Sequence, residues 1–241
     1  MRAQEFLIER WTQRTVDDYF DNKKQPKPSR KDFSISRPQD GCVLLKFKTI
    51  PDLTKSFFRM AEYYEGHRYS SKKQHVGMAE FLDNWMDRKG NADYFKFWDG
   101  FNITDSAFRS WSRTVGPLSQ AEQVVVDAIN KVTAGMKKFC VIGVSGDDPA
   151  TLQHEMFHAK YYLDTDFKQQ ADQLFDECRN DPVIKTMAKT LKTKLDYQAH
   201  VDEEVAAYLY AGSQLKLVFG VDAKSLVQRF QELGTFVEQP R

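Results

Sequence analysis

The stretch "KKFCVIGVSGDDPATLQHEMFHAKYYLD", residues 137–164, decides the fold because it indicates a strand followed directly by a capped helix. Residues 137–146 are a short apolar run that contains β-branched side chains and ends at glycine, which is typical of a strand. Asp147, Asp148 and Pro149 then place a carboxylate at the cap and proline at the first helical position. We therefore expect a helix that runs from this proline through residue 164.

The rest of the chain predicts more helices and little further sheet. Ser119 and Glu122 form a capping box ahead of an apolar helix. Apolar periodicity and glycine or proline breaks place the other elements. Helices are expected at residues 4–20, 52–66, 76–90, 121–136, 166–178, 183–212 and 222–236, and a strand at 41–50. The aromatic segment 94–102 is a strand or a packed loop, with a cleft lining as the less common alternative. The predicted class is α+β, predominantly helical.

One domain accounts for most of the chain. Residues 21–31 are polar and contain proline, so they separate an N-terminal arm from the body. We assign residues 1–30 to an N-terminal helix and linker arm, and residues 31–241 to a single domain. The core of that domain is expected at about 137–212.

Composition excludes several classes of protein. The 241 residues carry a net charge of +1, which offers no basic surface for nucleic acid or an anionic membrane. No stretch approaches the roughly 18 to 20 apolar residues of a membrane span, and no secretory signal is visible. The three cysteines lack the spacing of a disulfide framework or a zinc cluster. We therefore expect a cytoplasmic protein that binds neither nucleic acid nor membrane.

Two histidines on the predicted helix suggest a metal site. His154 and His158 are separated by one helical turn, so both imidazoles can reach one ion. Glu155 is offset by about 100° around the helix and lies beside the pair, where it suits a base rather than a third ligand. A catalytic zinc site needs three protein ligands and an open position. A third ligand must therefore come from elsewhere.

Four residues are candidates for the third ligand. Asp164 would lie about 15 Å along the helix from His154, too far to share an ion, and is better explained as a polar residue near the helix end. His200, Glu203 and Glu204 all fall on the predicted helix 183–212. His200 and Glu204 would share one face there, with Glu203 about 100° away. The residues alone leave these three open.

The pattern resembles a known family. "HEMFH" on a helix after "FCVIGV", followed by "DEEVAAYL" on a later helix, is similar to the zincin metallopeptidases, in particular the gluzincins. The resemblance covers residues 139–210. It implies a Zn²⁺ cofactor and a helix pair with a small sheet that borders the active-site cleft. It favours Glu204 as third ligand, then Glu203, then His200. Tyr161 replaces the glycine that metzincins need to close a site at position 164.

The same resemblance implies a reaction. A zincin hydrolyses peptide bonds, so the expected partner is a peptide or protein substrate. Glu155 would act as general base and then return the proton to the leaving amine. His200 and Tyr208 would donate to the developing oxyanion or orient a ligand. The strand at 139–144 would be the edge strand that pairs with an extended substrate.

An alternative function belongs to a different class. The helix pair would be structural in a catalytically silent binding or scaffold protein. The presence of Glu155 favours an enzyme, because a silent protein has little need of the base.

Overall fold

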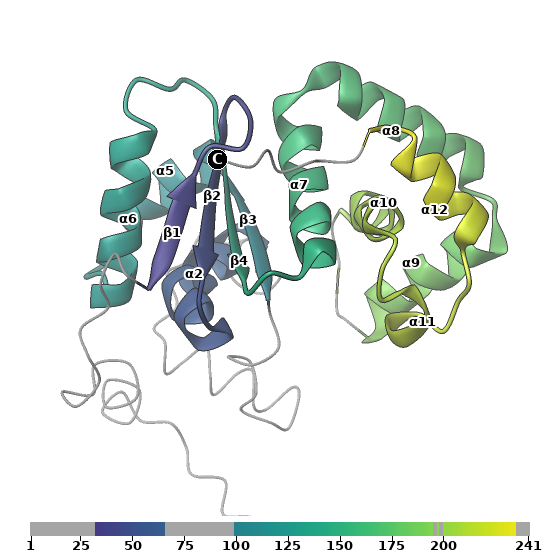
Figure 1. Ribbon diagram of the computed structural model, residues 1–241, viewed down its shortest axis with the longest axis horizontal. Coiled ribbons are helices and arrows are strands. Elements are labelled where there is room, and N and C mark those ends of the chain that lie inside the picture. Colours follow the sequence, from purple (N-terminus) through teal and green to yellow (C-terminus); the bar gives the residue numbers. More distant parts are fainter. Residues whose placement is uncertain (1–31, 66–98, 195–196, 198–199, 235–241) are drawn as a thin grey trace, which may run out of the picture.

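The computed structural model describes residues 32–65, 99–194, 197 and 200–234. Within these residues the chain is mostly helical and contains a small four-stranded mixed sheet (Figure 1). The predicted α+β class is confirmed at this level. The predicted N-terminal arm, the helix expected at 76–90 and residues 94–98 of the aromatic segment lie outside the described residues.

The sheet has the order β1-β2-β4-β3. Its strands are β1 (Phe33–Ser36), β2 (Cys42–Phe47), β3 (Gly100–Thr104) and β4 (Cys140–Ser145). The two central strands, β2 and β4, are parallel, and each outer strand is antiparallel to its neighbour. The strand predicted at 137–146 is therefore central, and the prediction that it forms the edge beside the cleft is wrong. Its first five residues are all buried, as suits a strand covered on both faces.

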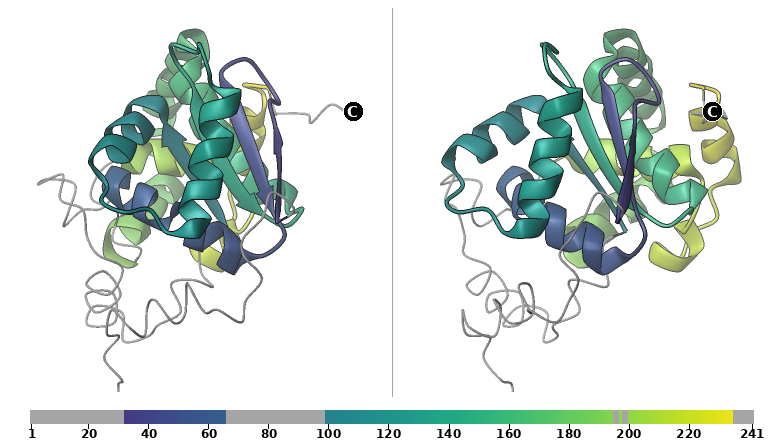
Figure 2. Two further views of the ribbon diagram at one scale, coloured as in Figure 1. Left: turned by 90° about the vertical axis from the view of Figure 1, so that its left-hand side faces the viewer. Right: turned by 60° about the vertical axis from the view of Figure 1, so that its left-hand side comes forward.

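One face of the sheet is covered by three helices, α2 (Ile50–Glu65), α5 (Asp105–Thr114) and α6 (Gln120–Val132) (Figure 2). Their apolar side chains and those of alternate strand residues form one buried core. The predicted capping box begins α6, because the Ser119 N–H donates to Glu122 Oε2 over 2.7 Å and the Glu122 N–H donates back to Ser119 Oγ over 3.3 Å.

Helix α7 (Pro149–Leu163) covers the opposite face and is the helix predicted from the opening stretch. The Asp148 side chain accepts hydrogen bonds from the N–H groups of Ala150 and Thr151, as expected of an N-cap. Met156 and Ala159 pack on the sheet, whereas Phe157 belongs to a second core on the other side of the helix. Helix α7 is therefore buried between two layers.

The second core lies in a helical lobe that follows α7 (Figure 1). The lobe contains α8 (Thr165–Cys178), α9 (Pro182–Lys194), α10 (Val201–Ala211), α11 (Leu215–Val218) and α12 (Lys224–Gln231). None of the helices in the described ranges combines the length and apolar character that crossing a membrane requires.

The prediction of one long helix at 183–212 is wrong, because the structure has two separate helices there, α9 and α10. Helix α9 ends at Lys194, and α10 begins only at Val201. His200 is the N-cap of α10 and has a left-handed φ of 56°, which a right-handed helix cannot continue through. His200 and Glu204 therefore do not share the face of one continuous helix.

Asp164 has the structural role that its position suggested. Helix α7 ends at Leu163, and Asp164 stands between α7 and α8. Its carboxylate accepts hydrogen bonds from the N–H groups of Asp166 at 2.9 Å and Phe167 at 3.0 Å, which caps α8.

Gly143 provides a test of how tightly α2 packs on the sheet. A Cβ atom at this position of β4 would lie 2.8 Å from Leu53 Cδ1 and from Phe57 Cε2. We expect Gly143→Ala to lower the free energy of unfolding by about 1–3 kcal/mol, because the overpacked side chains must move. Gly116→Ala is the control, since nothing lies within 4 Å of that site. Equal denaturation midpoints for both variants would contradict the packing described.

Candidate metal centre

Helices α7 and α10 bring three possible metal ligands together. His154 and His158 lie on α7 and Glu204 lies on α10, which packs along α7. The two histidine Nε2 atoms are 3.3 Å apart. Glu204 Oε2 is 3.5 Å from His154 Nε2, and Glu204 Oε1 is 3.4 Å from His158 Nε2. Within the described residues these side chains form a group that could hold a metal ion.

The spacing of these atoms suits a small tetrahedral ion. Zinc–nitrogen and zinc–oxygen bonds of about 2.0–2.1 Å place neighbouring tetrahedral ligands about 3.3–3.4 Å apart. The two histidine nitrogens are 3.3 Å apart, and each of them lies 3.4 or 3.5 Å from a different oxygen of Glu204, so these separations are close to that value. Two imidazole nitrogens and one carboxylate are also a donor set that zinc accepts. The residues present therefore fit the metal that the sequence predicted.

The buried Glu204 carboxylate requires a positive charge beside it. Its Oε2 atom is buried and accepts no hydrogen bond from the described residues. A buried carboxylate oxygen that accepts no hydrogen bond is costly, because it loses its hydration, and His154 Nε2 lies 3.5 Å from this oxygen. A cation bound between Glu204 and the two histidines would remove that cost.

Protons would compete with a metal ion for this group. Burial would raise the pKa of Glu204, but the adjacent His158 and His154 outweigh it and lower that pKa. Burial would lower the pKa of His158, but Glu204 and Glu203 outweigh it and raise that pKa. In the metal-free protein a proton on His158 therefore supplies the positive charge that the carboxylates require.

Glu203 has a separate position from Glu204. Its Oε1 atom lies 2.8 Å from His158 Nδ1, so the Nδ1–H group donates to this carboxylate. Once His158 loses its Nε2 proton, this hydrogen bond keeps the remaining proton on Nδ1 and leaves the Nε2 lone pair to face His154 and Glu204. Metal-binding histidines are commonly oriented in this way by a carboxylate. The structure thus places Glu204 among the possible ligands, whereas Glu203 accepts a hydrogen bond from one of them, His158.

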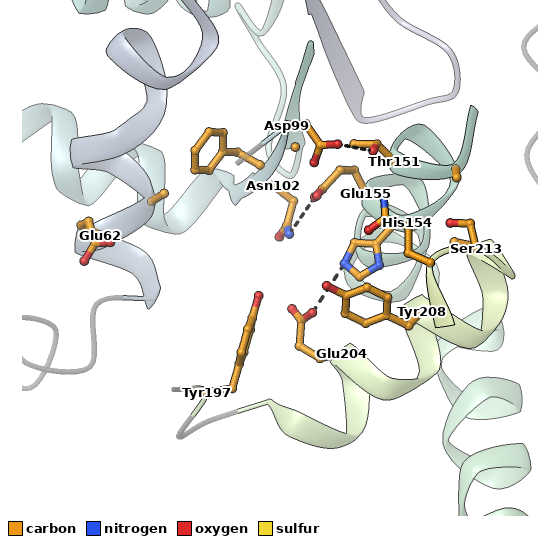
Figure 3. A pocket seen from close by; sticks show the side chains of 16 residues that line it. Glu62, Asp99, Asn102, Thr151, His154, Glu155, Tyr197, Glu204, Tyr208 and Ser213 are labelled. Atoms are coloured by element: carbon orange, nitrogen blue, oxygen red, sulfur yellow. Dashed lines mark hydrogen bonds and ion pairs between the residues drawn. The ribbon is translucent and has the colours of Figure 1, made fainter. Parts of the chain in front are cut away.

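Glu155 lies beside the ligand group, with its carboxylate against β3. Its Oε2 atom accepts a hydrogen bond from Asn102 Nδ2 over 3.2 Å (Figure 3). Burial raises the pKa of Glu155, while His154, His158 and the Asn102 amide oppose the rise. A carboxylate whose pKa is raised toward neutrality is better matched to proton transfer at physiological pH.

The two other predicted residues have different surroundings. Tyr208 lines the same pocket, and its ring centroid is 4.6 Å from that of His154. Burial and then Glu204 and Glu155 raise the pKa of Tyr208, so its hydroxyl keeps its proton and can donate. The His200 side chain is 71% exposed and is not among the residues that line this pocket. Its Nδ1 atom lies 3.8 Å from Glu203 Oε2.

Several residues of the cleft carry no signal in the sequence. The pocket is also lined by Gly100 and Asn102 on β3, Ala61 on α2 and Tyr197. Sheet topology brings β3 beside α7, and local sequence does not report that pairing. Phe101, from the predicted aromatic segment, is buried and stacks on Phe57 of the core at 5.9 Å.

Comparisons with protein-family models, with curated proteins and with solved structures find no match to this chain. The resemblance to zincins therefore rests on the residues of β4, α7 and α10.

A measurement of zinc affinity should distinguish the roles of Glu203 and Glu204. Glu204→Gln removes the charge of a possible ligand, so we expect it to weaken zinc affinity more than Glu203→Gln. Loss of an orienting carboxylate typically costs about 10–100-fold in metal affinity. Asp202→Asn is the control, because it removes a charge next to Glu203 in the sequence from an exposed side chain whose carboxylate lies 3.8 Å from Arg179 Nη2. Competition with a chromophoric chelator gives the affinities. A larger loss for Glu203→Gln than for Glu204→Gln would reverse the two assignments.

Zinc affinity should also depend on pH in a diagnostic range. Because the pKa of His158 is raised in the metal-free protein, zinc must displace a proton that an ordinary imidazole has already lost. We expect affinity to keep rising by about tenfold per pH unit above pH ~7.5, where a histidine of pKa ~6.5 is deprotonated. A plateau above that pH would contradict the proposed electrostatics.

Proposed function

We propose that this chain is a zinc-dependent metallopeptidase that hydrolyses peptide bonds. The observation that carries the proposal is the convergence of His154 Nε2, His158 Nε2 and the buried, partly unpaired carboxylate of Glu204. His154 and Glu204 also line a pocket, so the group is open to a small molecule on one side. Three protein ligands with one open position are typical of catalytic zinc.

Zinc bound there would act as a Lewis acid and lower the pKa of a coordinated water to about 7. Glu155 lines the same pocket next to this group and would accept the proton of the attacking water. The same carboxyl group would then give the proton to the leaving amine. The raised pKa of Glu155, caused by its burial, favours both transfers.

Tyr208 is the best placed donor for the charge that develops on the substrate. Its ring contacts His154 and its hydroxyl is kept protonated by burial and by the nearby carboxylates. A protonated hydroxyl at this position could donate a hydrogen bond to an oxyanion as its charge develops. His200 lies at the exposed start of α10, so we assign it no part in this step.

The cleft supports an extended substrate. Its lining comes from α2, β3, α7 and α10 and from residues beside them, among them Tyr197 and Ser213 (Figure 3). Within the described residues β3 is an outer strand, paired only with β4. An extended peptide can therefore add alongside β3, which takes over the role that the sequence suggested for the central strand β4. This arrangement favours a peptide over a compact small molecule.

Two variants test the reaction directly. Glu155→Gln should keep zinc but lose hydrolysis by about 100-fold or more, because the amide cannot accept the proton. His154→Ala should lose zinc itself. Zinc is measured by elemental analysis, and cleavage by mass spectrometry on a mixed peptide library with and without chelator.

The outcomes separate the competing functions. Full zinc content in His154→Ala would remove the site, and unchanged turnover in Glu155→Gln would remove the mechanism. Stoichiometric zinc with no cleavage by the wild type would favour the alternative, a catalytically silent binding or scaffold protein.

A further inference from the structure

We propose that Gly100 and Asn102 of strand β3 are positioning residues that fix the Glu155 carboxylate beside the metal group. This inference rests on the proposed function and adds to it the residues that place the base. Neither residue belongs to the ligand group, and both are far from α7 in the sequence.

The alternation of β3 makes the placement possible. Phe101 and Ile103 point into the core that α2 covers. Gly100 and Asn102 therefore point to the other face of the strand, toward α7. Strand β3 packs against α7 there, and Glu155 is the α7 residue that meets both.

Gly100 provides space rather than backbone freedom. Its φ lies outside the left-handed range, so any residue could adopt its conformation. A Cβ atom at this position would lie 2.8 Å from Glu155 Cγ and 2.9 Å from Cδ, and would be closer still to Oε1. The carboxylate thus occupies the volume that any other side chain at position 100 would fill.

Asn102 holds the Glu155 carboxylate in that space by a hydrogen bond. Its Nδ2 donates to Glu155 Oε2 over 3.2 Å, while Glu155 Oε1 lies against Gly100. One oxygen is therefore held by the amide and the other by contact with the strand. The hold matters because Glu155 is adjacent to His154 in sequence, and a free carboxylate could swing in and occupy the open metal position.

The first test is structural and needs no activity. Crystal structures of zinc-loaded wild type, Gly100→Ala and Asn102→Ala should show Glu155 against β3 in the wild type and displaced in Gly100→Ala. The three metal ligands should stay in place in all of them. A Glu155 carboxylate that keeps its wild-type position in Gly100→Ala would overturn the proposal. If Gly100→Ala does not fold, Asn102→Ala decides, since it adds no atoms: an unmoved, equally ordered Glu155 overturns the proposal.

The second test is kinetic, on the best-cleaved member of the peptide library. We expect kcat to fall about 100-fold in Gly100→Ala and about 10-fold in Asn102→Ala, with KM and zinc affinity near wild type. Gly116→Ala, at an open glycine, should match the wild type. Unchanged kcat in both β3 variants would overturn the proposal. If the wild type cleaves nothing, the proposed function fails, and the crystal structures still decide the positioning role.

Discussion

The packing of α10 against α7 is the constraint on which the rest of the structure depends. It brings the buried Glu204 carboxylate to two imidazoles that the spacing of α7 has already paired. A carboxylate at this depth needs positive charge, and its Oε2 atom has no hydrogen-bond partner among the described residues. The interface therefore holds together best with a cation, either a proton shared with His158 or a metal ion. A metal ion bound there would couple metal binding to the packing of these two helices.

The surrounding layers hold α7 in position for that contact. Met156 and Ala159 fix one side of the helix to the sheet, and Phe157 fixes another side to the helical lobe. Because these two sides of α7 are buried, its remaining face, with His154 and Glu155, lines the pocket. The outer strand β3 closes that pocket from the sheet side, where Asn102 contacts the proposed base. The proposed base and two of the three possible ligands thus lie on α7, and the third possible ligand, Glu204, comes from α10.

Local signals predicted the parts of this site that depend on local structure. Asp148 and Pro149 mark the start of α7, and the four-residue spacing of the histidines sets their shared face. Helix rise and the tyrosine at position 161 argue against Asp164 as a ligand, and in the structure Asp164 caps α8. The choice between Glu203 and Glu204 could not be made from residues, because it depends on the rotation of α10 against α7. The break at His200 was missed because the surrounding sequence lacks the glycine or proline that usually marks one. The strand β3 was obscured by Gly100 and Asn102, which are poor strand formers yet meet Glu155.

The most direct test of the central claim is an anomalous diffraction map, recorded at the zinc edge from crystals of the zinc-loaded protein. The account predicts one strong peak within about 2.0–2.2 Å of His154 Nε2, His158 Nε2 and a Glu204 carboxylate oxygen, with Glu203 still bonded to His158 Nδ1. The absence of a peak, with these side chains bonded only to one another, would contradict it, and so would zinc bound elsewhere on the chain.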